Sequence, residues 1–219
     1  AGKTAIVTGA ANGIGLAIAR HFVDHGANVM FADMDDKSLR RELGDSPEEG
    51  NIRYFAGDLR ERLSIANLLS ATLDAFDRVD ILVNACRQVV PTDPLDPDDD
   101  SVELMLQQNM MASLRLTQII ANRMIKQKTE GQAGAIVNLS SIAARRTHPE
   151  LLGYSVSTAA LDQMTRSMAV ALAPHRIRVN AVSFGSVMSA SLQDALKENA
   201  GYREDIEDHT PLGRVAAPG

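Results

Sequence analysis

The strongest constraint in this sequence is a regular alternation of strand-length apolar bursts with segments of helical spacing. Six bursts, several of them continuously apolar, occur at residues 5–8, 28–32, 52–56, 81–85, 135–139 and 177–182. Apolar residues with helical spacing occupy residues 14–25, 62–76, 101–125 and 154–173. Continuous apolar strands are typical of strands buried on both faces, which run parallel and are joined by right-handed helical crossovers. The pattern therefore predicts a doubly wound α/β sheet in three layers.

Length and composition predict a single domain over residues 1–219 and exclude several functional classes. The 219 residues are 45% hydrophobic and 23% charged, which is enough to bury one core. The formal net charge of −6, with Lys and Arg scattered, gives no electrostatic basis for binding nucleic acid. A single Cys and the lack of a long apolar run or a signal-like leader predict no membrane association and a cytoplasmic location.

A glycine-rich turn directly after the first predicted strand is a candidate dinucleotide site. It reads TGAANGIG over residues 8–15, and its candidate cofactor-binding residues are Gly9, Asn12, Gly13, Ile14 and Gly15. Small residues let the backbone approach a pyrophosphate, and the free amides and dipole of a helix N-terminus attract its negative charge. A tight turn that binds nothing is the alternative interpretation. After a buried strand and before a helix, the turn favours a Rossmann-type nucleotide site.

An acidic residue at the end of the second predicted strand supports this interpretation. Asp33 lies eighteen residues after Gly15, where a carboxylate can accept hydrogen bonds from the adenosine ribose hydroxyls. Residues 34–36 and the turn contain no Arg or Lys, so a 2′-phosphate would be repelled and we expect NAD rather than NADP. Asp58 and Leu59 close the third predicted strand at the height expected for adenine, with a helix cap as the alternative role of Asp58.

Further segments, in the same order along nearly the whole chain, resemble the short-chain dehydrogenase/reductase family. They are DL at residues 58–59, LVN at 82–84, IVNLSS at 136–141, YSVS at 154–157 and IRVNAV at 177–182. The resemblance implies a nicotinamide-dependent oxidoreductase that interconverts a secondary alcohol and a ketone. In the family pattern Tyr154 is the general acid/base, Ser141 holds the substrate oxygen and Asn109 supports a proton-relay water. A phenol ordinarily titrates near 10, so such a Tyr needs help to act as a base near neutral pH.

The resemblance also implies further cofactor contacts. Asn84 and Ala85 lie at the end of the fourth predicted strand, where the family reads Asn-Asn-Ala-Gly against the adenosine side of the cofactor. Val187 follows the sixth strand, and its backbone would receive the nicotinamide carboxamide. We therefore count these three residues, together with Tyr154, among the candidate cofactor-binding residues.

The sequence departs from the family pattern at the position of the active-site Lys, four residues after the Tyr, where it has Thr158. The Lys would bind the nicotinamide ribose and stabilise the tyrosinate; at ~4 Å and an effective dielectric of ~20 the Coulomb contribution is about 4 kcal/mol. A Thr hydroxyl carries no charge. We therefore expect impaired turnover, and a dinucleotide-binding protein without chemistry, acting as a redox-responsive or structural subunit, is the alternative function.

A second departure follows the fourth strand, where Cys86 and Arg87 replace the family's Ala-Gly. Arg87 brings a cation to the mouth of the expected active site. An acidic substrate is one partner for it, but we expect the side chain to turn to solvent. Cys86 is interpreted as a buried thiol, because no base that would activate it is evident.

Three expectations concern assembly, metals and the end of the chain. The helical segments at 101–125 and 154–173 carry more apolar residues than one face needs, which, with the resemblance, predicts a homodimer or homotetramer. The acidic run at 91–100 and the pair His21 and His25 are interpreted as a helix cap and a helix surface, not as metal sites. The family continues with a helix and a seventh strand after residue 214, so we expect the full-length protein to continue beyond Gly219.

Overall fold

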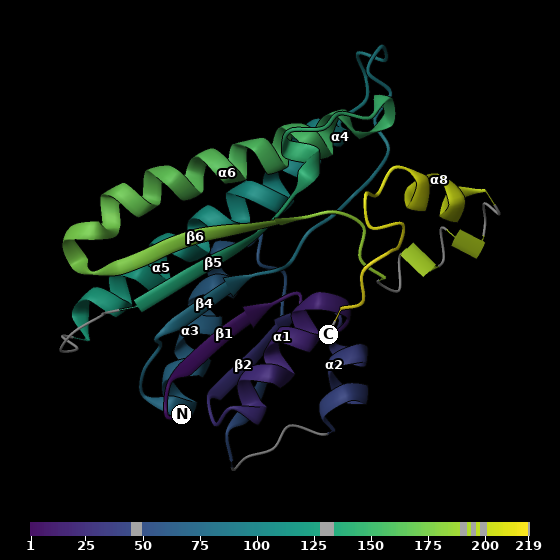
Figure 1. The fold of residues 1–219 in the computed structure, drawn as a ribbon. Helices are drawn as coiled ribbons and strands as arrows, with labels where there is room; N and C mark the ends of the chain where they lie inside the picture. The colour runs from purple at the N-terminus through teal and green to yellow at the C-terminus, as the bar shows by residue number, and fades with distance from the viewer. Residues whose placement is uncertain (45–49, 128–133, 189–191, 194–195, 198–200, 219) are drawn as a thin grey trace.

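Six strands form one parallel sheet in the order β3-β2-β1-β4-β5-β6, as the computed structural model shows (Figure 1). The structure describes residues 1–44, 50–127, 134–188, 192–193, 196–197 and 201–218. The strands are β1 Thr4–Thr8, β2 Asn28–Asp33, β3 Ile52–Ala56, β4 Ile81–Asn84, β5 Gly134–Ser141 and β6 Ile177–Phe184. The prediction of a doubly wound α/β sheet is confirmed. The strand order reverses between β1 and β4, which opens a crevice at the carboxyl ends of these strands.

Helices cover both faces of the sheet because each strand is apolar on both sides. On one face lie α1 (Gly13–Asp24) and α2 (Asp36–Leu43), around a core that includes Val7 and Phe31. On the other face lie α3 (Arg62–Phe76), α5 (Ala112–Lys126) and α6 (Leu152–Leu172), around a core that includes Ile6 and Ile136. Consecutive residues of β1 thus point into opposite cores. None of the helices in the described ranges has the length and apolar character that a membrane span requires.

The helices of the structure differ from the prediction in two places. The sequence analysis missed α2, which is mostly charged and buries only Leu39, but is capped by the Asp35 carboxylate accepting from the Ser38 amide at 3.0 Å. The single helix predicted at 101–125 is three segments: α4 (Ser101–Met105), the π-helical turn η1 (Leu106–Met111) and α5. A π turn is wider than an α-helical turn, and such turns occur frequently at functional sites. Here it carries Asn109.

Short 3-10 turns and one further helix connect the remaining elements. The turns η2 (Ile142–Ala144) and η3 (Pro149–Leu151) lead from β5 into α6, and η4 (Ala173–His175) leads from α6 into β6. The helix α8 (Tyr202–Asp208) lies beside the carboxyl ends of the strands in Figure 1. The strand ends and these connections together surround the crevice.

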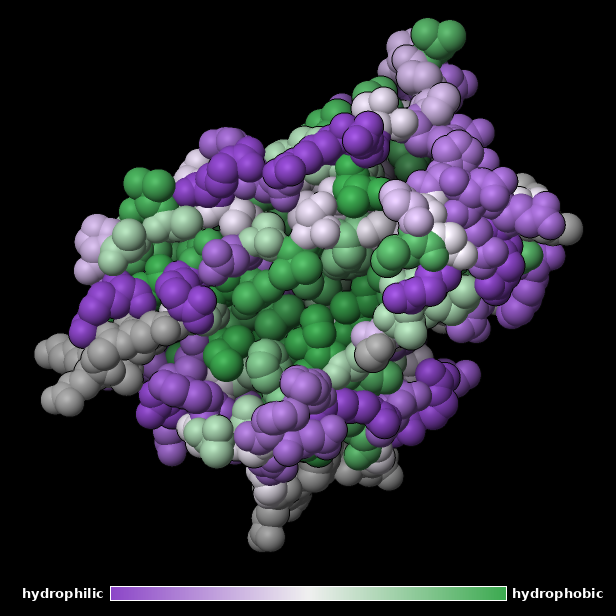
Figure 2. All heavy atoms as spheres, in the orientation of Figure 1, coloured by the Kyte–Doolittle hydropathy of each residue, from purple (hydrophilic) through white to green (hydrophobic). Residues whose placement is uncertain are grey.

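The face of the sheet that bears α1 and α2 is only partly covered. These helices pack mainly on β1, β2 and β3. On β6 every second residue and most of the carboxyl-terminal half are exposed, and the Val182 side chain is 51% exposed. Figure 2 shows apolar side chains gathered over the middle of the sheet below α6. The site described below lies at the strand ends, beside this surface.

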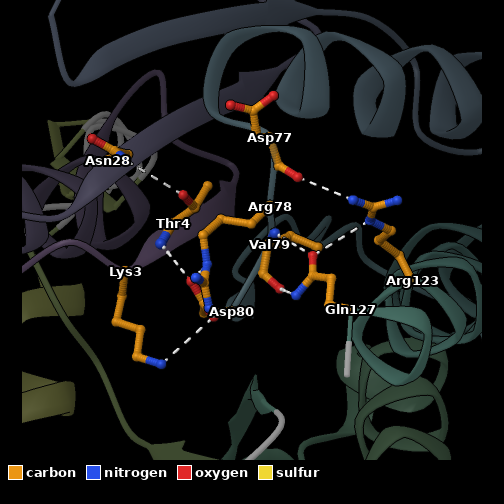
Figure 3. A network of polar contacts seen from close by, with 9 residues as sticks. All are labelled: Lys3, Thr4, Asn28, Asp77, Arg78, Val79, Asp80, Arg123 and Gln127. Carbon is orange, nitrogen blue, oxygen red and sulfur yellow. Dashed lines mark hydrogen bonds and ion pairs between the residues drawn. The ribbon is translucent and has the colours of Figure 1, made fainter. Parts of the chain in front are cut away.

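A polar network fastens the opposite, amino-terminal end of the sheet (Figure 3). Asp80 is 3% exposed and accepts a hydrogen bond from the Thr4 amide at 2.9 Å and from the Arg78 guanidinium at 2.6 Å. Burial opposes ionisation of Asp80, but these hydrogen bonds hold its pKa below the usual value. Gln127, at the end of α5, bonds both backbone groups of Val79 at 2.8 and 2.9 Å. The network ties β1 and β4 to α5 before the strands run toward the crevice.

Candidate functional site

The glycine-rich turn between β1 and α1 packs closely against the end of β4. Gly9 and Gly13 adopt positive φ angles of 63° and 54°, a region that favours glycine. A Cβ at Gly9 would lie 2.9 Å from the Ala85 carbonyl oxygen, and one at Gly15 would overlap the Gly9 carbonyl. Asn12 at the N-cap of α1 makes no side-chain capping bond, so it leaves the first-turn amides uncapped. The turn therefore has the close backbone approach and free donors that a dinucleotide pyrophosphate requires.

A cavity of about 390 Å³ extends from this turn along the carboxyl ends of the strands. Of the predicted cofactor-binding residues it is lined by Gly9, Asn12, Gly13, Ile14, Gly15, Asp33 and Ala85. The sequence analysis did not assign the other lining residues to the cofactor site, namely Met34, Arg60, Cys86, Arg87, Gln88, Gln108, Leu139 and Phe184. The cavity thus joins the glycine turn, the acidic strand end and the segment after β4. These are the groups that a dinucleotide site needs.

Asp33 is fixed at the edge of this cavity. Its half-buried carboxylate accepts from the Ala11 amide and from the Asp35 amide, both at 3.1 Å. Each oxygen accepts one backbone hydrogen bond and retains lone pairs for ligand hydroxyls. The carboxylate is therefore oriented before any ligand binds.

The structure brings a cation into the same cavity, which the sequence analysis missed. Arg60 lines the cavity, and its guanidinium pairs with the Asp58 carboxylate at 2.6 Å. The hydrogen bond from Arg60 is the largest cause that lowers the pKa of Asp58 below its usual value. The N-cap of α3 is Glu61, so Asp58 does not cap that helix. β3 ends at Ala56, two residues before Asp58, and Leu59 is buried in the core.

Five predicted cofactor-binding residues lie outside the cavity lining, namely Asp58, Leu59, Asn84, Tyr154 and Val187. Asn84 is 4% exposed, and its amide donates to the Asn138 side chain at 2.7 Å and to the Thr117 hydroxyl at 3.2 Å. Its side chain therefore fastens β4 to β5 and α5. Val187 is half-buried and forms a β-bridge with Ala216.

Tyr154 and Ser141 lie at the junction of β5 and α6. Tyr154 is 5% exposed in the first turn of α6 and packs with Met105 and Ala143. The buried Ser141 hydroxyl accepts from the Ala143 amide at 3.1 Å. An accepting hydroxyl keeps its own proton for another partner. Ser141 can therefore still donate a hydrogen bond to a substrate oxygen.

Thr158 is buried one helical turn after Tyr154 and bonds only to its own helix among the described contacts. Its hydroxyl donates to the Tyr154 carbonyl at 2.9 Å and to the Ser155 carbonyl at 3.2 Å. This is the common pattern in which a helical Thr bonds a carbonyl of the preceding turn. Thr158 thus provides neither a charge nor a free hydroxyl proton at the position of the family's Lys.

The expectation that Arg87 turns to solvent was wrong. Its Nη1 donates a hydrogen bond to the Tyr154 hydroxyl at 3.1 Å, across 67 residues of sequence. Its Cζ lies 4.9 Å from the centroid of the Phe184 ring, within the range of a cation–π interaction. The half-buried guanidinium therefore lies between β4, β6 and α6, and it lines the cavity.

Asn109, in the π turn, holds the segment that carries Arg87. Its Oδ1 accepts from the Gln88 amide at 2.7 Å, and its Nδ2 donates to the Gln88 carbonyl at 2.9 Å and to the Ser157 hydroxyl at 3.1 Å. On the other side of Arg87, the Thr8 hydroxyl accepts from the Cys86 amide at 3.1 Å. Asn109 is 3% exposed, so these three side-chain hydrogen bonds are shielded from solvent.

Comparison with known proteins agrees with this geometry. A family model described as "Enoyl-(Acyl carrier protein) reductase" matches residues 9–219. The chain belongs to the short-chain dehydrogenase/reductase family. It is similar to the L-fucose dehydrogenase of Mus musculus, with 29% identity over 99% of this chain and 78% of the relative. It is also similar to the L-rhamnose 1-dehydrogenase (NAD(P)(+)) of a Sphingomonas species, with 31% identity over 99% of this chain and 85% of the relative.

A solved structure shows the same fold. A short-chain dehydrogenase/reductase of unknown function from Caenorhabditis elegans, crystallised with its cofactor, matches with a TM-score of 0.86 and 29% identity. The match covers 100% of this chain and 84% of the other. The protein is therefore an oxidoreductase of this family, whose cofactor is NAD(P).

Within this family site, Cys86 is a neutral thiol. Burial, and secondarily the negative charge of Asp33, raise the pKa of Cys86 to about 11. The Gln108 amide donates to its sulfur at 3.1 Å. No group of three or more His, Cys, Asp or Glu side chains within the described ranges is placed to hold a metal ion.

Proposed function

We propose that this protein interconverts a secondary alcohol and a ketone with NAD(H) as cofactor. The observation that carries the proposal is the connection between the dinucleotide-type cavity and Tyr154. Arg87 lines that cavity, and its guanidinium donates to the Tyr154 hydroxyl at 3.1 Å. This hydrogen bond supports the proposal because it links the hydroxyl of Tyr154, the proposed proton donor and acceptor, to a residue at the edge of the cavity.

Ser141 and Tyr154 have different roles in the proposed reaction. Ser141 donates a hydrogen bond to the substrate oxygen and orients it. In the oxidation, Tyr154 in its phenolate form accepts the proton of the substrate hydroxyl, and in the reduction it returns that proton to the carbonyl oxygen. A bound nicotinamide supplies the acceptor, or in reverse the donor, of the hydride at the carbinol carbon. The alcohol thus loses one proton and one hydride and becomes a ketone.

The cofactor would be held by the glycine turn, by the acidic strand end and by the segment after β4. The turn amides would bind the pyrophosphate, and Asp33 would accept from the adenosine ribose hydroxyls. We propose NAD over NADP because a 2′-phosphate would meet the oriented Asp33 carboxylate, while the nearby cation, Arg60, is already paired with Asp58.

We propose a polyhydroxylated, sugar-type alcohol as the substrate class. This rests on the sugar dehydrogenases among the similar proteins, which act on L-fucose and L-rhamnose by name. The fold alone does not select a substrate. A screen therefore begins with sugars and polyols and extends to other ketones.

One observation favours a second function, a dinucleotide-binding subunit without chemistry. The Thr158 hydroxyl bonds to backbone carbonyls and leaves the position of the family's Lys without a cation. Calorimetric titration with NADH and NADPH, combined with a dehydrogenase screen on wild type and Tyr154→Phe, separates the two. Turnover that Tyr154→Phe abolishes supports the oxidoreductase, whereas NADH binding without turnover supports the binding subunit. Failure to bind either dinucleotide contradicts both.

A further inference from the structure

We propose that Arg87 replaces the missing lysine cation and stabilises the ionised form of Tyr154. The inference rests on the proposed function, in which the Tyr154 oxygen exchanges a proton with the substrate. The two departures from the family pattern, Thr158 for Lys and Arg87 for Gly, are distant in sequence. In the structure both meet the same tyrosine, Thr158 at its backbone and Arg87 at its hydroxyl.

The geometry of the Arg87 contact suits this role. The phenol oxygen accepts from Nη1 at 3.1 Å, so the tyrosine keeps its own proton for the substrate. A guanidinium stays protonated throughout the working pH range, and an opposite charge within ~4–6 Å favours the ionised form of its neighbour. Tyr154 is 5% exposed, so the phenol end of the pair is largely shielded from solvent.

The apolar side chains packed against Tyr154 carry no charge that competes with Arg87. They are Met105, Ala143, Val90 and Leu151. On the segment that carries Arg87, the Cys86 thiol stays neutral because burial raises its pKa to about 11. Arg87 forms no ion pair with a carboxylate in the part of the chain that the structure describes. Its positive charge is therefore directed at the phenol and the Phe184 ring.

The position of Arg87 is fixed by the backbone on both sides. Asn109 binds the amide and the carbonyl of Gln88, and the Thr8 hydroxyl accepts from the Cys86 amide. The Phe184 ring lies 4.9 Å from Cζ and limits the guanidinium on one face. A cation held in this way loses little side-chain freedom when it pairs with the phenolate.

An optical titration tests the inference without requiring turnover. The chain has three Tyr and no Trp, so Tyr54→Phe with Tyr202→Phe leaves Tyr154 as the single source of tyrosinate absorbance. In this background Arg87→Met should make tyrosinate absorbance appear at higher pH than in the parent, and Arg87→Lys should restore most of the difference. Arg166→Met, which changes the net charge equally on the exposed side of α6, is the matched control and should leave the titration unchanged. Titrations of Arg87→Met and its parent that coincide would overturn the proposal.

A charge-swap experiment tests the same inference through the reaction. Arg87→Gly should lower turnover near neutral pH by about tenfold to a thousandfold, and activity should recover at alkaline pH. Adding Thr158→Lys to Arg87→Gly should restore turnover, because it returns a cation to the family position. A rise in KM for acidic substrates alone, with kcat and the optical titration unchanged, would assign Arg87 to substrate binding and overturn the inference. If wild type turns over no alcohol or ketone, the proposed function fails, while the optical titration still decides the role of Arg87.

Discussion

Asn109→Ala tests whether the π turn exists to hold the segment that carries Arg87. The substitution removes two hydrogen bonds to Gln88, at 2.7 and 2.9 Å, and one to the Ser157 hydroxyl at 3.1 Å. Each buried hydrogen bond contributes about 0.5–1.5 kcal/mol net, and an unsatisfied buried partner costs about 1–3 kcal/mol. Gln88 is only half-buried, so water can replace part of the loss. We therefore expect about 2 kcal/mol of destabilisation, which lowers Tm by about 4–8 °C in a chain of this size.

The measurement is thermal unfolding followed by far-ultraviolet circular dichroism, because the chain has no Trp to report by fluorescence. Ser113→Ala is the matched control: its hydroxyl bonds only the Asn109 carbonyl, at 3.1 Å, within the same helical segment. That control should lower Tm by no more than about half as much. A Tm for Asn109→Ala equal to that of Ser113→Ala would refute the reasoning, because the Gln88 contacts would then contribute nothing.

Four further predictions concern other parts of the molecule. Asp80→Asn should lower the free energy of unfolding by about 2 kcal/mol, because it removes the charge that pairs with Arg78. Folding lowers the pKa of Asp80, so its charge stabilises the protein above the unfolded carboxyl pKa of ~4, and this contribution is lost as the pH falls through the folded pKa. Denaturant melts of wild type and Asp80→Asn over this pH range should show the difference. Isothermal titration should give a lower Kd for NADH than for NADPH, and Asp33→Asn should narrow the difference; tighter NADPH binding by wild type contradicts the role of Asp33. Cys86 should react slowly with neutral iodoacetamide at pH 8, where about one thiol in a thousand is ionised, and labelling as fast as that of a free thiol would show the site to be more open than the structure. Light scattering of the full-length protein at micromolar concentration should give a homodimer or homotetramer, and a monomer would refute that expectation.

Much of the fold is determined by patterns that are local in the sequence. Apolar bursts of strand length predicted all six strands, and the helical spacing at 62–76 predicted α3 with its observed bounds, Arg62–Phe76. The hydrophobic effect acts on each burst through its own composition, so burial on both faces can be predicted without knowing the neighbours. α2 could not be predicted in this way, because it has only one fully buried residue, Leu39, and therefore almost no apolar pattern.

The sequence indicated candidate site residues only where a short motif by itself requires a particular backbone conformation or position. The glycine turn and Asp33, both found from the sequence, line one cavity, because glycine at a positive φ and a carboxylate at a strand end are requirements that adjoining residues impose. The pairing of Arg60 with Asp58 is also short in range, but nothing in the residue types shows that the guanidinium enters the cavity.

The tertiary structure alone decided how the tyrosine is surrounded. The sequence identifies Thr158 as an uncharged residue and Arg87 as a cation, but not that the first bonds its own helix while the second reaches the phenol. Arg87 can turn to solvent or inward from the same backbone. Its direction depends on Phe184 from β6, on the π turn around Asn109 and on the start of α6, which the fold brings together from separate parts of the chain. Side-chain contacts of this kind follow from packing between distant elements, and no local pattern of residues encodes them.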